Sequence, residues 1–596
     1  MKSRIKLKEK GLLHNWVFWL ILITGIAIII RSIPAWLNAA WGVDFGIYYG
    51  LTNSFIQTSE FINIYDGWGD SYQYFPVLYT ITGGLHWITG IDIIELLPKI
   101  APIFGGLTIP IFYFIVKDLI KDKKIALISS AILAVSILHI YQTSHAAPLT
   151  IGHFFMMISL YFFLKYQKNP MFSIPLVLST VLLILSHHFT TYFFILTITF
   201  LTFAYVSKRK KITRQAWYIL AYVFFASTAA FSYWIFVAKP VYQGFMSSNF
   251  FLPAWAIVGL YYILVVTSLF TMTKWDKINP LNYIKLNFFD MNKYKKIALA
   301  FCVALGLLII VSITGLPGVY IRITPLAIIY SVPTILILSL SYAGLSYLKS
   351  LRNGFLIKGW FIGIFLSLLY SLTSAKLLPD RHLEYLIVPL CIPAALTIIE
   401  IIKDHPIKWI KEHTVASIEH IESHKYFKRN ILAVVLIALL FVANLLSAYP
   451  AIDSLNAIDE RVSDNCINTL DWMKGNVSNT SVFASDHRLE MLAWAEGFKI
   501  TQGTTNCTWY TENLTDYKDE LIELNVTHII IDDIMRYKVV NVDVGKYYYM
   551  TNESYDKFNS SPFELIYRNE TLNDEFEEIH WVEIYQVNRS LLMKDE

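Results

Sequence analysis

The sequence predicts an α-helical polytopic membrane protein that ends in a small extracytoplasmic α/β domain. Of its 596 residues, 55% are hydrophobic and only 16% are charged, well below the charged share of a soluble globular protein. Apolar runs long enough to cross a bilayer recur through most of the chain. The charge then changes sign, because residues 450–596 hold 27 Asp and Glu against 12 Lys and Arg. We therefore predict a transmembrane domain over residues 1–449 and a polar domain over residues 450–596.

The apolar runs number about thirteen, each of the roughly 17 to 25 residues that a span requires. The first, "WVFWLILITGIAIII", follows "MKSRIKLKEK" and is followed directly by Arg31 without a small-x-small cleavage site. This pattern favours a retained anchor over a cleaved signal peptide. We expect the second span near residues 98–116 and the last near residues 430–448.

Basic clusters between the runs predict the topology. Placing each cluster on the cytoplasmic side gives a cytoplasmic N-terminus, a long first external loop over residues 34–97 and an external C-terminal domain. The apolar stretch 76–97 then lies in or beside the interface, because counting it as a span would invert every later loop. Topology accounts for the basic residues, so we expect no nucleic-acid partner. The predicted location is the cell membrane.

Glycosylation sequons give an independent indication of the same topology. None of the 16 asparagines before position 476 lies in an N-x-Ser/Thr sequon, whereas nine of the 11 from there onward do. An external tail would be accessible to N-glycosylation, although a Ser/Thr-rich tail also produces some sequons by chance. The nine candidate sites are Asn476, Asn479, Asn506, Asn513, Asn525, Asn552, Asn559, Asn569 and Asn588.

The tail shows the pattern of a small α/β domain. Short β-like runs, "SVFAS", "KITQG" and "THIIID", alternate with helix-like "HRLEMLAWA" and "DYKDELIEL", and "FELIY" with "WVEIYQV" is typical of a closing pair of strands. Asp486, His487 and Arg488 follow the first strand, where α/β sheets often bind ligands, but a helix cap at Asp486 is the favoured interpretation. Cys466 and Cys507 permit one disulfide and do not require it.

Ionisable residues gather at the predicted outer face of the membrane domain. Such residues are costly at membrane depth and tend to face a bundle interior or a water-filled cavity. Basic and acidic groups at one face would suit a substrate with an anionic head and a membrane-bound hydrocarbon. Each also has a simpler explanation: Asp44 could cap a helix over "FGIYYGLTNSFIQ", the arginines could contact lipid headgroups, and the histidines could be ordinary interfacial residues. The residues are Asp44, Asp66, Asp70, His139, His145, His187, His188, Arg322, Asp380, Arg381, His382 and Glu384.

Three stretches resemble GT-C-type membrane glycosyltransferases. The first external loop has an early acidic residue, Asp44, followed some thirty residues later by "YFPVLY" and an amphipathic segment. "LSHHFTTYF" and "LPDRHLEYLIVPL" are similar to patterns in archaeal members. The predicted spans followed by an external domain also resemble the oligosaccharyltransferase catalytic subunit and, distantly, protein O-mannosyltransferases.

The resemblance implies a transferase that uses a polyprenyl-phosphate- or diphosphate-linked sugar as donor. It gives Asp44 the role of catalytic or acceptor-orienting carboxylate, and it gives Arg381 and Arg322 the role of binding the donor phosphate. Asp70, His187, His188 and His382 are further candidates for substrate binding. The chain departs from the oligosaccharyltransferase pattern, because it has no Trp-Trp-Asp-Tyr-Gly motif, only the short loop "TGLPGVY", and no paired acids in "YQTSHAAPLT" that would complete a divalent-metal site.

The sequence therefore favours an inverting glycosyltransferase that moves a sugar from a lipid-phosphate carrier to an extracytoplasmic glycan, lipid or protein, with no predicted cofactor. An oligosaccharyltransferase-like enzyme is the alternative within the class. A lipid-linked-sugar flippase or transporter, or a scaffold displaying the tail, is the alternative outside it. A transporter would be expected to show inverted repeats or ionisable residues at mid-membrane.

Overall fold

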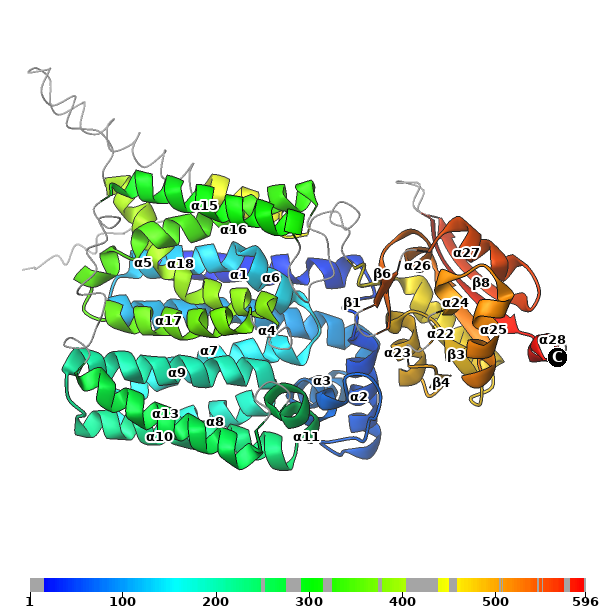
Figure 1. Ribbon diagram of the computed structural model, residues 1–596, viewed down its shortest axis with the longest axis horizontal. Helices are drawn as coiled ribbons and strands as arrows, with labels where there is room; N and C mark the ends of the chain where they lie inside the picture. The colour runs from blue at the N-terminus through cyan, green and yellow to red at the C-terminus, as the bar shows by residue number, and fades with distance from the viewer. Residues whose placement is uncertain are drawn as a thin grey trace, which may run out of the picture.

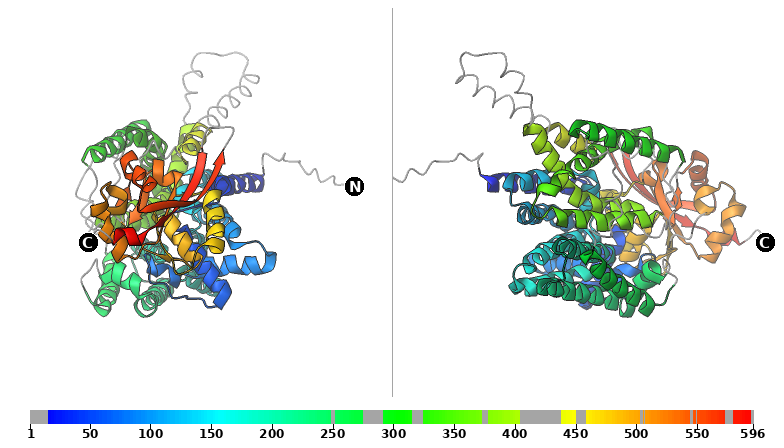
Figure 2. Two further views of the ribbon diagram at one scale, coloured as in Figure 1. Left: turned by 90° about the vertical axis from the view of Figure 1, so that its right-hand side faces the viewer. Right: turned by 60° about the vertical axis from the view of Figure 1, so that its left-hand side comes forward.

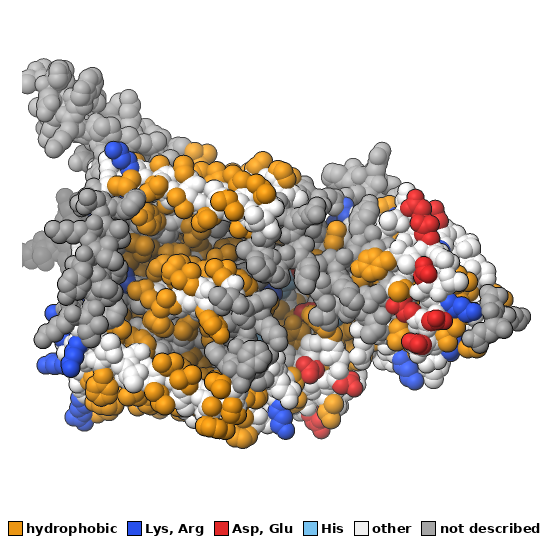
Figure 3. All heavy atoms as spheres, in the orientation of Figure 1, with side chains coloured by type: hydrophobic (Ala, Val, Ile, Leu, Met, Phe, Trp, Pro, Cys, Tyr) orange, Lys and Arg blue, Asp and Glu red, His pale blue; other side chains and the backbone are white. Residues whose placement is uncertain are grey.

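A bundle of long helices carries a small sheet domain at one end (Figure 1). The computed structural model describes residues 15–247, 252–274, 291–314, 324–372, 378–403, 438–449, 458–502, 505, 507–543, 546–548, 550–572 and 579–593. Hydrophobic side chains cover the bundle, whereas acidic side chains gather on the sheet domain (Figure 3). The two parts thus present surfaces suited to two different solvents, which confirms the predicted fold class of a polytopic helical protein with an α/β tail.

Ten helices in the described part of the chain are long and apolar enough to cross a membrane, or eleven if the pair α5 (Lys123–Val135) and α6 (Ile137–Ser144), bent by 61°, is one span. The protein is therefore a multi-pass membrane protein. The ten are α1 (Trp16–Leu37), α4 (Ile93–Ile120), α7 (Pro148–Tyr166), α9 (His188–Arg209), α10 (Arg214–Phe236), α13 (Ala254–Thr273), α15 (Lys293–Thr314), α16 (Pro325–Gly344), α17 (Gly354–Ser371) and α18 (Pro379–Lys403). Between them lie α8 (Ser173–Ile184), α11 (Lys239–Val241), η3 (Pro170–Phe172), η4 (Tyr242–Ser247) and η7 (Tyr347–Ser350).

The described part of the chain holds fewer spans than the predicted thirteen. The first part of the span expected near residues 430–448 lies outside the described residues, which resume at 438 within a helix. The second span begins earlier than predicted, because α4 starts at Ile93 rather than near 98. Pro98, Pro102 and Pro110 all lie within this helix.

The first external loop forms its own short elements. After α1 come β1 (Ala40–Trp41), α2 (Phe45–Thr58), η2 (Asp70–Tyr74) and α3 (Val77–Thr89). The helix expected over "FGIYYGLTNSFIQ" is α2. At 13 residues, α3 is about 20 Å long, too short to cross the hydrocarbon core. The stretch 76–97 is thus not one continuous span.

Loops with predicted cytoplasmic charges meet at the end of the bundle opposite the sheet domain (Figures 1 and 3). Lys117 Nζ lies 4.8 Å from the centre of the Trp16 ring at the start of α1. Lys165 forms a 2.6 Å ion pair with Asp118, and Asn353 donates a 2.8 Å hydrogen bond to the carbonyl of Leu119. The ends of α4 and α7 and the loop before α17 therefore share one face.

The sheet domain lies at one end of the helix bundle in both views of Figure 2. Its main sheet has five strands in the order β4-β3-β5-β9-β8. Strands β3, β4 and β5 are parallel, while β9 runs antiparallel to both β5 and β8. All five residues of β5 are buried, as expected for an unbroken apolar run in a central strand. Its elements are β2 (Arg461–Val462), α22 (Asp464–Asn476), β3 (Val482–Ala484), α23 (His487–Ala495), β4 (Lys499–Ile500), α24 (Cys507–Tyr510), α25 (Leu514–Glu523), β5 (His528–Asp532), α26 (Asp533–Tyr537), β6 (Val540–Asp543), β7 (Lys546–Tyr548), α27 (Asn552–Asp556), η9 (Lys557–Asn559), β8 (Phe563–Leu572), β9 (Ile579–Val587) and α28 (Arg589–Leu592).

The sheet domain docks on the first external loop. Strand β2 pairs antiparallel with β1, which aligns Ala40 with Val462. Helix α23 packs so closely on α2 that a Cβ atom at Gly46 would lie 2.5 Å from the backbone of Leu492. At Gly50 it would lie 2.3 Å from the Trp494 ring. Two glycines four residues apart thus let α2 and α23 approach each other.

The two tail cysteines do not pair. Cys466 is buried in the sheet domain and Cys507 is exposed, and both are free thiols. Burial, together with the nearby Asp532, raises the pKa of the Cys466 thiol to about 12. Cys466 is therefore an inert packing residue.

Candidate functional site

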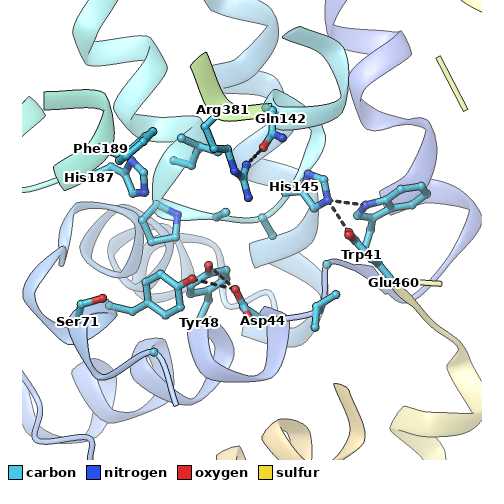
Figure 4. Close-up of a pocket in the computed structure, with 18 of the residues that line it drawn as sticks. Trp41, Asp44, Tyr48, Ser71, Gln142, His145, His187, Phe189, Arg381 and Glu460 are labelled. Atoms are coloured by element: carbon cyan, nitrogen blue, oxygen red, sulfur yellow. Dashed lines mark hydrogen bonds and ion pairs between the residues drawn. The ribbon is translucent and has the colours of Figure 1, made fainter. Parts of the chain in front are cut away.

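A cavity of about 450 Å³ lies where the helix bundle, the first external loop and the sheet domain meet. Its walls come from segments far apart in the sequence: residues 41–48 and 68–72, residues 141–149, residues 187–189, residues 378–381, and tail residues 458, 460 and 541. Figure 4 shows Asp44 and Arg381 on opposite walls. The cavity therefore combines an acidic residue of the first loop with an arginine of a late span.

Asp44 directs its carboxylate into this cavity. It occupies the N-cap position of α2, but its side chain makes no capping hydrogen bond, so the simple capping explanation does not account for it. Oδ2 accepts hydrogen bonds from Tyr72 at 2.9 Å and, at a longer 3.4 Å, from Tyr48. Oδ1 lies 3.1 Å from His487 Nε2.

The two tyrosines remain neutral donors to Asp44. Burial raises the pKa of the Tyr72 phenol, and the adjacent Asp44 carboxylate raises it further. Burial likewise raises the pKa of Tyr48, with Tyr72 and Asp44 adding to the effect. Both phenols therefore keep their protons at neutral pH and hold the carboxylate in one orientation.

Arg381 lies in the first turn of α18, on the wall that faces Asp44 (Figure 4). Its guanidinium donates a hydrogen bond to the Oε1 atom of Gln142. A guanidinium presents five donors in a planar fork that matches a phosphate. The positive end of the α18 dipole adds to its attraction for an anion.

A second acid reaches the cavity from the tail. Glu460 accepts a 2.7 Å hydrogen bond from Tyr141, and its carboxylate lies 2.6 Å from His145 Nε2. The same His145 nitrogen lies 2.8 Å from the indole nitrogen of Trp41. Burial alone would raise the pKa of Glu460, but His145 and Tyr141 hold that pKa below its ordinary value. Glu460 is thus an ionised cavity residue.

The paired histidines of "LSHHFTTYF" also line the cavity. His187 is the N-cap of α9, where its Nδ1 accepts a 3.3 Å hydrogen bond from the amide of Thr190. The ring of His188 lies 5.3 Å from that of Phe75. Both are therefore held in place by neighbours while presenting a surface to the cavity.

Other predicted site residues lie elsewhere. The Asp70 carboxyl is outside the cavity lining, and burial raises its pKa. His382 is fully buried between helices, 2.8 Å from Ser367 Oγ. Arg322 and the side chain of Asp380 lie outside what the structure describes.

Three outer-face residues remain. Asp66 is exposed, whereas the other two have partners within the bundle. His139 binds Arg31 in the bundle interior at 2.8 Å, and Glu384 is buried against His153.

Several cavity residues are not predicted by the sequence. Tyr72, Gln142 and Glu460 carry no motif or spacing that marks them as functional. His487 belongs to the triplet after β3, where the sequence favours a helix cap at Asp486. That cap is confirmed, because the Asp486 side chain accepts a 3.1 Å hydrogen bond from the amide of Leu489. The contact of His487 with Asp44 depends on docking and could not be read from the triplet.

The chain is similar in structure to ArnT. The crystal structure of ArnT from Cupriavidus metallidurans bound to undecaprenyl phosphate matches with a TM-score of 0.47 and 11% identity, covering 95% of this chain and 98% of that one. The apo structure of the same protein matches with a TM-score of 0.47 and 11% identity, covering 97% and 99%. No protein-family model and no curated protein matches the sequence.

Among the described residues, no group of three His, Cys, Asp or Glu side chains is arranged to hold a metal ion. The two carboxylates in the cavity lining, Asp44 and Glu460, each accept a hydrogen bond from a tyrosine.

Most candidate sequons are accessible. Among the eight whose asparagine is described, the side chain is exposed at all but Asn569, which is half-buried on β8. Asn506 lies outside the described residues. None of the eight lines the cavity. The exposed asparagines are Asn476, Asn479, Asn513, Asn525, Asn552, Asn559 and Asn588.

Proposed function

We propose that the protein is an integral-membrane glycosyltransferase that moves a sugar from a polyprenyl-phosphate-linked donor to an extracytoplasmic acceptor. The observation that carries this proposal is that Asp44 and Arg381, 337 positions apart, line one cavity from opposite walls. These are the two residues to which the resemblance assigns the acid and phosphate-binding roles. A cavity at the end of an apolar bundle suits a donor whose hydrocarbon stays in the membrane.

The reaction follows from the chemistry of the two side chains. The acceptor hydroxyl attacks the anomeric carbon while the bond from that carbon to the phosphate oxygen breaks. Asp44 takes the hydroxyl proton as general base. The electron pair of the broken bond remains on the phosphate, whose growing negative charge is stabilised by Arg381. Attack opposite the leaving phosphate inverts the anomeric carbon.

The proposal includes the orientation of the chain. Basic loops gathered at the end of the bundle opposite the sheet domain support a cytoplasmic position for that end. The exposed sequon asparagines of the sheet domain support an external position for the cavity and the tail. The acceptor would then reach the cavity from outside the cytoplasm.

Donor binding tests the role of Arg381. We expect Arg381→Ala to weaken binding of a polyprenyl phosphate by about tenfold or more, since a hydrogen bond to a charged group contributes about 1.5–3 kcal/mol. Arg381→Lys should restore binding only in part, because an ammonium cannot bind phosphate through two parallel donors. Binding can be measured by fluorescence with a labelled lipid in detergent micelles.

Two variants serve as controls. Arg352→Ala removes an exposed arginine from the loop before α17, at the other end of the bundle, and should bind like the wild type. Asp44→Asn should also bind the donor, because it alters the opposite wall. Equal binding by wild type and Arg381→Ala would contradict the assigned donor site.

A further inference from the structure

The sheet domain contributes a side chain to the surroundings of Asp44. His487 is the first residue of α23, 443 positions from Asp44. Its Nε2 lies 3.1 Å from Asp44 Oδ1, and the two side chains are only 6% and 19% exposed. The His487 ring packs edge-on against Trp68 with 4.5 Å between ring centres. The imidazole is therefore clamped between an aromatic ring and the carboxylate.

Docking of the sheet domain fixes this contact. Because Gly46 and Gly50 carry no Cβ atom, α23 packs directly against the start of α2, which follows Asp44. Tyr49 donates a 2.8 Å hydrogen bond to Glu496 at the far end of α23. Asp486 caps α23, so the position of its first residue, His487, is fixed. His487 lies beside the start of α2.

Counting lone pairs shows what His487 does for the carboxylate. An ionised carboxylate offers about four acceptor positions. Tyr72 and Tyr48 share Oδ2, and His487, with its proton on Nε2, donates to Oδ1. About one position on Oδ1 is then left to accept a proton from a substrate.

We propose that His487 is a positioning residue for Asp44, so that the sheet domain completes the active site of the membrane domain. The proposal rests on the glycosyltransferase function proposed above. His487 does not touch the transferred sugar in this scheme. It holds Oδ1 so that the free lone pair faces the acceptor hydroxyl, and docking of the tail becomes a condition for turnover.

Steady-state kinetics of the full-length protein test the proposal. His487→Phe keeps a ring against Trp68 but removes the donor, and it should lower kcat by about ten- to hundredfold, as expected when a reacting group is misplaced by about 1 Å. The KM for the lipid-linked donor should change little, because Arg381 is untouched. His487→Gln should restore most of kcat, since its amide nitrogen is as many bonds from Cα as Nε2.

A matched variant separates positioning from mere folding. His580→Phe removes another imidazole of the sheet domain, one that lies 2.9 Å from Asp533 and does not touch Asp44, and it should keep wild-type kcat. The proposal is overturned if His487→Phe has wild-type kcat, or if His487→Gln and His487→Phe are equally impaired.

An assay without turnover distinguishes failure of this proposal from failure of the proposed function. Carbodiimides react with carboxyl oxygens, and removal of His487 leaves Oδ1 of Asp44 without this hydrogen bond and so more open to reaction. Mass spectrometry should therefore find more modification of Asp44 in His487→Phe than in wild type, His487→Gln or His580→Phe. If the wild type transfers no sugar but this pattern holds, the function fails and the positioning role stands. Equal modification in all four proteins refutes the positioning role.

Discussion

At the scale of single residues, Asp44 shows what the sequence predicts about the site and what it does not. Its place before a helix and among aromatic residues marked it as a candidate, and it does line the cavity. Tyr72 in the same loop and His487 in the tail contact it, and Arg381 faces it from the opposite wall. No local pattern indicates contacts between residues hundreds of positions apart, so Asp44 and Arg381 could be predicted as site residues but the contact of Asp44 with His487 could not.

A buried triad in the sheet domain gives a pH prediction. Arg488 donates to Asp486 at 2.6 Å and to both oxygens of Asp532 at 3.1 Å, with all three residues buried. Burial raises the pKa of Asp532 to about 7, with Asp486 adding to the effect and Arg488 opposing it. The folded state therefore binds this proton more tightly than the unfolded state.

The direction of the pKa shift of Asp532 determines how stability should change with pH. A group whose pKa is raised by folding stabilises the fold below its unfolded pKa, and that contribution is lost as pH rises through the folded value. The melting temperature of Asp532→Asn minus that of the wild type should therefore increase as pH rises from 4 to 7. Thermal unfolding of the full chain in detergent measures this difference. A difference that stays constant over this range would contradict the assignment.

At the scale of elements, local patterns were reliable where burial and capping decide the structure. The apolar run "THIIID" became the central strand β5, and the pair "FELIY" and "WVEIYQV" became β8 and β9. The two-residue pairing of β1 with β2 was not predictable, because it joins residues 40 and 462. That pairing has consequences for the site, since Gly42 donates to the carbonyl of Glu460 at 3.0 Å and so helps to position this acid at the cavity.

The contact between α2 and α23 is tested by adding one methyl group. Gly46→Ala would put a Cβ atom 2.5 Å from the α23 backbone, and the backbone cannot yield as a flexible side chain could. We expect α23 to be displaced, turnover to fall sharply and the melting temperature to decrease. Overpacking of this kind costs about 1–3 kcal/mol.

Gly84→Ala is the matched control. Gly84 lies in α3, and a Cβ there would meet nothing within 4 Å. Because Ala has a higher helix propensity than Gly by about 1 kcal/mol, this variant should be at least as stable as the wild type and fully active. If both variants behave alike, close approach of α2 and α23 is not needed.

At the scale of the whole molecule, composition alone indicated two parts in two solvents, and the distribution of apolar and acidic side chains agrees (Figure 3). The docking of these parts around a shared cavity was not foreseen. Predicting it would require knowing which faces of α2 and α23 meet, and that depends on two glycines rather than on hydrophobic periodicity.

Glycosylation tests the predicted orientation. If the tail faces the glycosylating compartment, a tail fragment from a glycosylating host should shift in mobility after enzymatic deglycosylation. The membrane domain, which has no sequon, provides the internal control and should not shift. A tail whose mobility is unaffected would remove this support for an external tail.

Chelation separates the proposed enzyme from a metal-dependent, oligosaccharyltransferase-like one. Asp44 is already held by Tyr72 and His487, so we expect turnover to survive exhaustive treatment with EDTA. Loss of turnover that returns on addition of a divalent cation would favour the metal-dependent alternative.

The central claim is that Asp44 drives sugar transfer from a lipid-linked donor. It is tested most directly by offering the purified protein in lipid radiolabelled polyprenyl-phosphate and polyprenyl-diphosphate sugars in turn, beside Asp44→Asn. We predict release of label by the wild type with one class of donor, and none by the variant, although the variant still binds that donor. No release by the wild type with any donor, despite an intact fold and measurable donor binding, would contradict the claim and favour a flippase or a scaffold.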